Sequence, residues 1–247
     1  MPCHVTDGFF SPSSPPPSLP RALSSVHRSP AARAHLVDVY NHLTLGVALA
    51  AVGAWLHLQT NLGGLLSALG ALGCLLALSG TPDSAVTRGK RTGLFLGFTL
   101  LKGLSLGPLI AMALRVNPAL ITTAALGTTL VFACFSASAY FSDKRSMIYL
   151  GGLLGSALSL LALASLINLF VGSALLFNMQ LYGGLLVFCG YVVFDTQMIL
   201  FKADMGQRDP ISGAVELFID FAAIFVRILI ILMKNSGNKQ RRDDRRR

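Results

Sequence analysis

Charged residues are scarce in this chain. Only 13% of its 247 residues are charged, against about a quarter in an average soluble domain, and Glu216 is its one glutamate. Hydrophobic residues make up 53% of the chain, and the mean hydropathy is +0.63. A soluble globule of this composition would leave too much apolar surface in water. The scarcity of charge therefore excludes a soluble domain, and the scarcity of acids excludes an acidic disordered protein.

Motifs for catalysis and for resident metal ions are also missing. The four cysteines show no CxxC spacing, so neither a zinc site nor a disulfide framework is indicated. There is no HExxH, and no glycine-rich loop is followed by Lys-Ser or Lys-Thr. An intramembrane aspartyl protease would carry a GxGD signature, but the chain has FIDF at that place. We therefore expect neither an enzyme nor a bound cofactor.

Composition divides the chain into three parts. Residues 1–34 form a Pro/Ser-rich arm without the apolar core of a signal peptide, so we expect this arm to be disordered and cytosolic. Residues 35–234 form a membrane domain with seven segments, and residues 235–247 form a basic tail. We expect the tail to bind anionic lipid headgroups. Nucleic acid is not expected as a partner, because no aromatic residues interleave with the basic ones.

Long apolar runs predict an all-α polytopic membrane protein embedded in the lipid bilayer. We place its membrane segments at residues 37–58, 62–79, 92–114, 118–141, 147–170, 174–200 and 213–233. Each of the first six is long enough to cross about 30 Å of hydrocarbon, the second only just. Small residues four apart let helices approach closely in lipid. Such pairs occur at Gly93/Gly97, Gly103/Gly107 and Gly151/Gly155.

Basic residues in the short loops predict a cytosolic N-terminus. Ten of them fall on the side of the N-terminus, and only Arg115 falls on the other. The ten are Arg21, Arg28, Arg33, Arg88, Lys90, Arg91, Lys144, Arg145, Lys202 and Arg208. The seventh segment breaks this pattern, because a full crossing would carry the basic tail to the side of Arg115. It also contains Glu216, Asp220 and Arg227, which lipid would not tolerate on an exposed face. The segment either re-enters and returns, or spans the membrane shielded by the other six.

Three acids in the last two segments are the candidate functional residues. Asp195 lies seven residues before Lys202 and Glu216 lies seven after Asp209, so both carboxyls are expected about 10 Å below the same interface. Asp220 lies one turn deeper, on the helix face of Glu216. Carboxyl groups this close in a medium of low dielectric cannot all be ionised, so we expect a shared proton at neutral pH. Such a cluster could also ligate Ca²⁺ through oxygen and exchange it for protons.

Two basic residues offer a purely structural role for the same acids. Arg227 lies seven residues past Asp220 and therefore on nearly the same helix face. Lys102 is the one charged residue of the third segment. If the acids pair with Arg227 or Lys102, they only hold the bundle together. Lys102 could instead extend its ammonium group toward the interface.

The last two segments carry a recognisable pair of motifs. They read GYVVFDTQMIL and ELFIDFAAIFVRILIILMKN, and the basic tail follows. With GLSLGPLI, NPALITTAALGTTLVFACFSASA and YLGGLLGSALSLL upstream, they resemble the Bax inhibitor-1 branch of the transmembrane BAX inhibitor motif-containing family over residues 36–235. The resemblance implies six transmembrane helices around a central seventh. It also implies a multi-pass protein of the endoplasmic reticulum membrane that suppresses apoptosis and ER stress signalling, with Bcl-2-type cell-death regulators as partners.

The same resemblance implies a pH-sensitive calcium leak channel, with Ca²⁺ as cargo and protons as regulators. Asp195 of FDTQ and Asp220 of FIDF match the aspartate pair that senses pH in the family, and Glu216 matches a third acid with one methylene more. Lys102 departs from the family pattern, and a fixed positive charge near a cation path would oppose conduction. Two alternatives stay open: a non-transporting membrane protein that restrains cell-death partners, and a proton-coupled calcium antiporter.

Overall fold

The computed structural model describes residues 30–84, 86–141 and 147–244, and it describes side chains up to residue 237 except those of 147–149. Most of the predicted arm, the loop with Lys144 and Arg145, and the last three residues lie outside these ranges. All secondary structure in the described ranges is α-helical. The helices are α1 (Pro30–Thr60), α2 (Leu65–Ser79), α3 (Arg88–Val116), α4 (Ala119–Phe141), α5 (Met147–Val171), α6 (Ala174–Asp204) and α7 (Pro210–Asp244).

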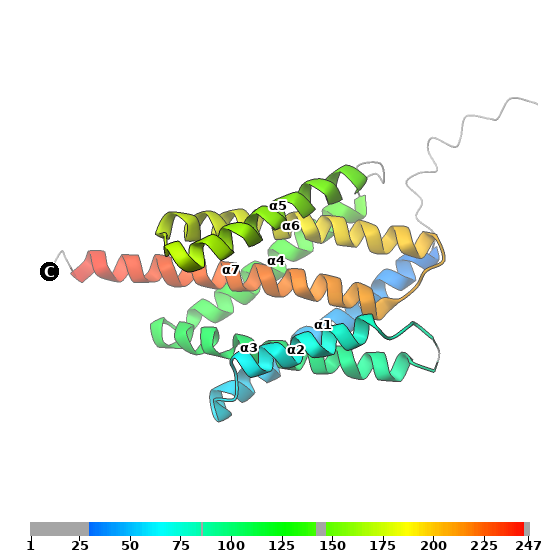
Figure 1. Ribbon diagram of the computed structural model, residues 1–247, viewed down its shortest axis with the longest axis horizontal. Coiled ribbons are helices and arrows are strands. Elements are labelled where there is room, and N and C mark those ends of the chain that lie inside the picture. The colour runs from blue at the N-terminus through cyan, green and yellow to red at the C-terminus, as the bar shows by residue number, and fades with distance from the viewer. Residues whose placement is uncertain (1–29, 85, 142–146, 245–247) are drawn as a thin grey trace, which may run out of the picture.

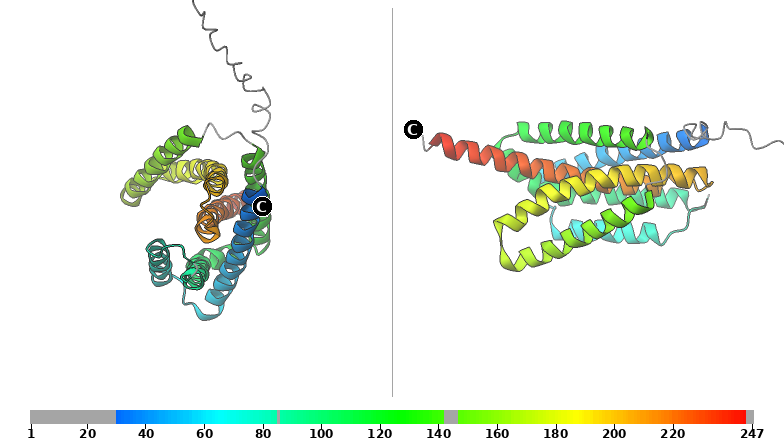
Figure 2. Two further views of the ribbon diagram at one scale, coloured as in Figure 1. Left: turned by 90° about the vertical axis from the view of Figure 1, so that its right-hand side faces the viewer. Right: turned by 90° about the horizontal axis from the view of Figure 1, so that it is seen from above.

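The helices run back and forth along the long axis of the molecule, and α7 lies in the middle of them (Figure 1). It packs against α1, α3, α4 and α6, whereas α2 packs mainly on α3 and α5 on α6, farther from the centre. The view along the bundle in Figure 2 shows that the ring around α7 is open on one side, between α2 and α3 and the α5–α6 pair. The predicted all-α membrane fold is confirmed, and the ring around its central helix is incomplete.

The outer faces of the bundle are apolar. Side chains such as Leu66, Leu126 and Phe170 are 83%, 73% and 87% exposed. Exposed apolar surface of this extent suits lipid and not water. In the described ranges, five helices are long and apolar enough to cross a membrane: α1, α3, α4, α5 and α6. α2 is only 15 residues long, and α7 carries three charged residues in its central turns.

Helices α1 and α3 are held together by glycines. A Cβ atom on Gly103 would collide with the backbone of Ala50 in α1, and one on Gly107 would collide with the His57 ring. The predicted close approach is therefore confirmed for the Gly103/Gly107 pair. Gly93 and Gly155 face open space, so their spacing does not mark a helix crossing.

The seventh segment is one continuous helix. α7 has no reversal between Pro210 and Asp244, and it runs from the end where α1 begins to the opposite end of the bundle (Figure 1). From Ile211 to Ile230 its residues are buried or half-buried, with Ile219 as the exception. The re-entrant alternative is therefore wrong, because a re-entrant segment turns back, whereas α7 runs buried along the bundle as the second alternative requires. A helix surrounded by its neighbours can carry charged residues that lipid would not accept.

Candidate functional site

Antiparallel packing of α6 and α7 brings the candidate acids together. Asp195 lies nine residues before the end of α6 and Asp220 ten residues after the start of α7, so each is about 14–15 Å from that end of the bundle. Their carboxyl groups face each other closely enough for one proton to be shared between them. Asp220 is only 3% exposed, and Asp195 is half-buried. The structure therefore places Asp195 level with Asp220, and not with Glu216 as the residue spacing predicts.

Glu216 lies one turn nearer the end of the bundle. Its Oε1 accepts a hydrogen bond from the Lys202 ammonium at 3.3 Å, and the side chains of Lys202 and Glu216 are 41% and 37% exposed. A polar cavity of about 220 Å³ opens beside this pair, lined in part by Gln207, Asp209 and Ser212. A partly screened ion pair of this kind contributes little to stability. Glu216 therefore lies at a polar opening above the buried Asp195–Asp220 pair.

The three acids do not form a metal cage. Within the described ranges, no three His, Cys, Asp or Glu side chains are placed so that they could hold a metal ion together. Asp195, Asp220 and Glu216, which we predicted to ligate Ca²⁺ together, are therefore not gathered into one set of ligands in this arrangement. The reason is that the Glu216 carboxylate turns to Lys202, while the two aspartates face each other.

Arg227 and Lys102 do not pair with the acids either. The Arg227 guanidinium donates a hydrogen bond to the carbonyl of Ala223 (2.9 Å) and stacks on Phe188 of α6, with its central carbon 4.4 Å from the ring centre. Among the described residues, Lys102 has no acidic partner. The predicted ion pairs between these two basic residues and the three acids are therefore absent from the described part of the chain.

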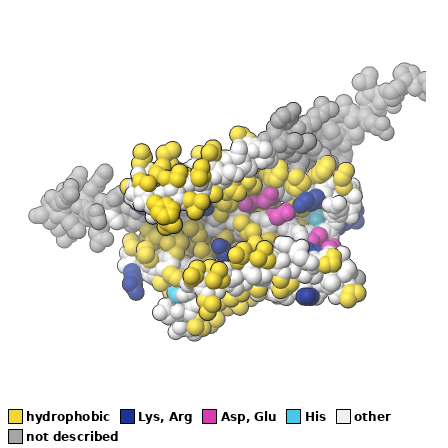
Figure 3. Space-filling view, in the orientation of Figure 1, with side chains coloured by type: hydrophobic (Ala, Val, Ile, Leu, Met, Phe, Trp, Pro, Cys, Tyr) yellow, Lys and Arg dark blue, Asp and Glu magenta, His cyan; other side chains and the backbone are white. Residues whose placement is uncertain are grey.

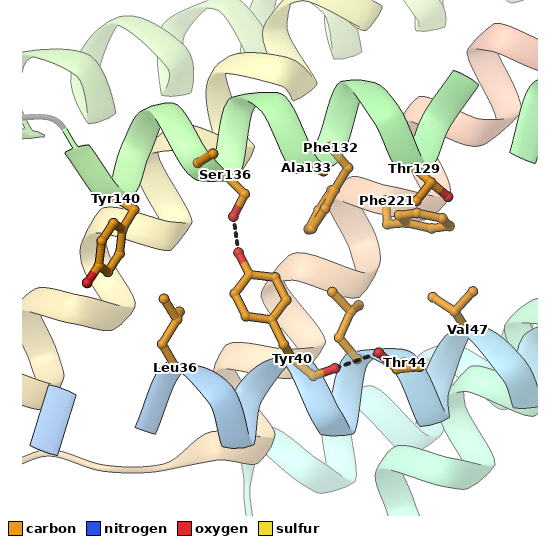
Figure 4. A pocket seen from close by; sticks show the side chains of 12 residues that line it. Leu36, Tyr40, Thr44, Val47, Thr129, Phe132, Ala133, Ser136, Tyr140 and Phe221 are labelled. Carbon is orange, nitrogen blue, oxygen red and sulfur yellow. Dashed lines mark hydrogen bonds between the residues drawn. The ribbon is translucent and has the colours of Figure 1, made fainter. Parts of the chain in front are cut away.

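A chain of hydroxyl groups lies next to the aspartate pair, and the sequence did not single it out. Tyr40 points from α1 across a cavity of about 540 Å³ and hydrogen-bonds to Ser136 of α4 (Figure 4). The Ser136 hydroxyl in turn lies 3.3 Å from that of Thr196 in α6. Thr196 follows Asp195 directly, so these bonds tie three helices together beside the acids. The available signal was the set of hydroxyl residues inside apolar segments, but such residues also occur in apolar helices without any functional role.

Arg91 and Asp209 hold the start of α7, and the sequence did not predict this contact. Asp209 accepts hydrogen bonds from the backbone N–H groups of Ile211 (3.1 Å) and Ser212 (3.4 Å), and so caps the helix. The Arg91 side chain is 4% exposed and lies 2.5 Å from Oδ2 of Asp209 and 3.1 Å from Oδ1 of Asp83. Burial works to raise the pKa of Asp209, but hydrogen bonds from Ser212 and Arg91 and the charge of Arg91 outweigh it. The pKa of Asp209 therefore lies below its ordinary value.

We expect Arg91→Met to destabilise the bundle by about 2 kcal/mol at pH 7, because a buried hydrogen bond to a charged group is lost. Since the pKa of Asp209 is lower in the folded state, its contribution is present above the ordinary value of 3.8 and is lost as the pH falls through the folded value. The difference between wild type and variant is therefore expected to shrink as the pH falls from 7 to 3. Unfolding in detergent at several pH values measures this.

Lys90→Met is the matched control for this prediction, since Lys90 is the exposed neighbour of Arg91. It should change the free energy of unfolding by less than about 0.5 kcal/mol. If Arg91→Met and Lys90→Met have the same free energy of unfolding, Arg91 does not hold the start of α7.

Fold and site together define a polytopic helical membrane protein whose central helix carries a buried acid paired with an acid of its neighbour. Comparison with known proteins identifies the family within this class. The family described as "Inhibitor of apoptosis-promoting Bax1" matches residues 32–237. The chain therefore belongs to the Bax inhibitor-1 family, as its motifs predicted, and is a multi-pass membrane protein of an anti-apoptotic family.

Similar proteins come from animals and plants. Bax inhibitor 1 of Homo sapiens is 45% identical over 217 residues, which cover 87% of this chain and 92% of the human protein. Bax inhibitor 1 of Mus musculus is 46% identical with the same coverage. Bax inhibitor 1 of Arabidopsis thaliana is 44% identical over 213 residues, covering 86% of this chain and 85% of the plant protein.

Proposed function

We propose that this protein is a pH-sensitive calcium leak channel of the endoplasmic reticulum membrane that suppresses apoptosis and ER stress signalling. The observation that carries the proposal is the close approach of the Asp195 and Asp220 carboxyl groups inside the bundle, where Asp220 is only 3% exposed. Two carboxyl groups this close form a hydrogen bond when one of them carries a proton. One titratable contact therefore joins the central helix to its neighbour.

The protonation of this pair provides a switch. With one proton, the pair makes a charge-assisted hydrogen bond, which is about twice as strong as a neutral one and holds α6 against α7. In acid a second proton converts it to two neutral acids, and the contact weakens. α6 and α7 can then separate at this level, which opens the path in acid.

Unpartnered oxygen atoms support passage of a cation beside the pair. Oδ2 of Asp220 and Oε2 of Glu216 are buried and have no hydrogen-bond partner among the described residues. A buried carboxylate oxygen without a partner is costly unless water or a cation satisfies it. In this proposal Glu216 attracts Ca²⁺ to the polar opening, and Lys202 competes with the ion for that carboxylate. Ca²⁺ is cargo here, and the protein needs no cofactor.

Location and partners are part of the same proposal. The basic tail would bind anionic lipid headgroups on its side of the membrane. Bcl-2-type cell-death regulators would be protein partners. A lower calcium content of the endoplasmic reticulum would link the leak to suppression of cell death.

Calcium release from liposomes containing the purified protein tests the proposal. We expect faster release at pH 6 than at pH 8, no release from protein-free liposomes, and no pH response with Asp195→Asn. No release at either pH from folded protein would favour a non-transporting protein that restrains cell-death partners. Uphill movement of Ca²⁺ driven by a pH gradient would instead identify a proton-coupled antiporter.

A further inference from the structure

The open side of the helix ring contains a cavity with two basic side chains. It has a volume of about 550 Å³ and is lined by residues of α2, α3, α6 and α7. Most of its lining is apolar, for example Leu72, Leu75 and Phe188, and its basic residues are Lys102 and Arg227. Figure 3 shows a hollow between α6 and the α2–α3 pair, with a basic side chain (dark blue) in it. In a bilayer this side faces lipid tails.

Both basic residues lie well inside the bundle. Lys102 is 14 residues from either end of α3, or about 21 Å. Arg227 is 17 residues, or about 26 Å, from the start of α7, and it faces Gly184, ten residues or about 15 Å from the start of α6 at the other end. The two charges are therefore at the depth of the hydrocarbon, where an unpaired charge costs several kcal/mol. The described residues include no acid paired with either one.

Arg227 is only partly satisfied by the protein. One terminal nitrogen binds the carbonyl of Ala223, but its buried Nε has no hydrogen-bond partner among the described residues. Phe188 covers one face of the guanidinium. Gly184 of α6 makes room for the group, because a Cβ there would collide with Nε. Arg227 is thus held at the wall of the cavity with a positive charge that no acid among the described residues neutralises.

We propose that this cavity binds a long-chain fatty acid, with its carboxylate between Lys102 and Arg227 and its tail along the apolar wall. A cavity open to the bilayer is filled by acyl chains, because an empty one loses dispersion contacts. An anionic head neutralises both charges, and a guanidinium binds a carboxylate through two parallel hydrogen bonds. A fatty acid has a small head that can lie at this depth, whereas a phospholipid headgroup stays at the interface. This proposal does not depend on the proposed leak, because its test measures binding of the fatty acid and not calcium flux.

Labelling with a photoreactive diazirine fatty acid tests the proposal on the full-length protein in detergent. We expect labelled peptides from α2, α3, α6 and α7, and competition by oleate but not by uncharged oleyl alcohol. Lys102→Gln and Arg227→Gln are each expected to reduce labelling about tenfold, the equivalent of about 1.4 kcal/mol. Lys90→Gln, an exposed site outside the cavity, should leave labelling unchanged.

Charge-preserving variants keep the test valid if the glutamine variants fail to fold. Lys102→Arg and Arg227→Lys are expected to retain most of the labelling. Equal competition by oleate and oleyl alcohol would overturn the proposal, because the cavity would then accept any chain. Labelling spread over all outer faces, or stronger competition by phosphatidic acid than by oleate, would also overturn it.

Discussion

Replacing Asp220 with asparagine is expected to abolish the pH response of calcium release. Asparagine has nearly the size of aspartate and can donate a hydrogen bond to Asp195, so the contact between α6 and α7 is kept. It cannot titrate, so the shared proton is lost. The ratio of release at pH 6 to release at pH 8 should fall from several-fold in the wild type to about 1. The measurement is calcium release from liposomes with equal amounts of folded protein.

Asp38→Asn is the matched control for Asp220→Asn, since Asp38 is an exposed aspartate on α1 outside the pair. It should leave the ratio at the wild-type value. An Asp220→Asn protein that still releases calcium faster in acid would contradict the switch, and the pH sensor would have to lie elsewhere. If Asp195→Asn also loses the pH response of calcium release, the two carboxyl groups act as one unit.

Gly103→Val is expected to cause the largest loss of stability among single substitutions in the bundle. The first carbon of any side chain at this position meets the backbone of Ala50, and a backbone cannot turn aside as a side chain can. α1 and α3 would have to move apart, and the contacts around Gly53 and Gly107 would be lost with them. We expect a cost of about 3 kcal/mol or more, measured by thermal unfolding and by the yield of monodisperse protein in detergent.

Gly152→Val separates this collision from the general effect of valine in a helix. Gly152 lies inside α5, and a Cβ there meets nothing within 4 Å. The intrinsic helix propensity changes in the same way at both positions. Gly152→Val should therefore unfold near the wild-type temperature. Similar unfolding temperatures for Gly103→Val and Gly152→Val would show that the α1–α3 crossing is looser than the structure indicates.

The helical segments and the family membership of the chain were predictable, because both depend on signals that are local in the sequence. Apolar runs mark helices wherever the solvent is lipid, and the predicted segments correspond to α1–α7 with shifted ends. The paired motifs around Asp195 and Asp220 identified the family over nearly the residues that the family comparison matches. The convergence of the acids also followed from local facts, because two adjacent segments with a short loop must lie side by side.

Contacts between distant helices were not predictable. Arg91 and Asp209 are 118 residues apart, and the Tyr40–Ser136 bond spans 96 residues. In a soluble protein, polar faces reveal how a helix is rotated. Here lipid-facing and core-facing positions are both apolar, so the sequence pattern gives little information about rotation. The same ambiguity left a pairing of Arg227 with Asp220 open as an alternative, although the guanidinium lies against Phe188.

The sequence by itself therefore determined the membrane environment, the number of segments, the family and the pair of helices that carries the acids. Composition, apolar length and short motifs suffice for these properties, because each acts within one segment or its neighbour. Only the tertiary structure decided that α7 spans the bundle as a buried helix, that Asp195 meets Asp220 while Glu216 meets Lys202, and that the helix ring is open beside Lys102 and Arg227. These depend on the rotation, tilt and offset of helices far apart in the chain, and packing of the whole bundle sets all three.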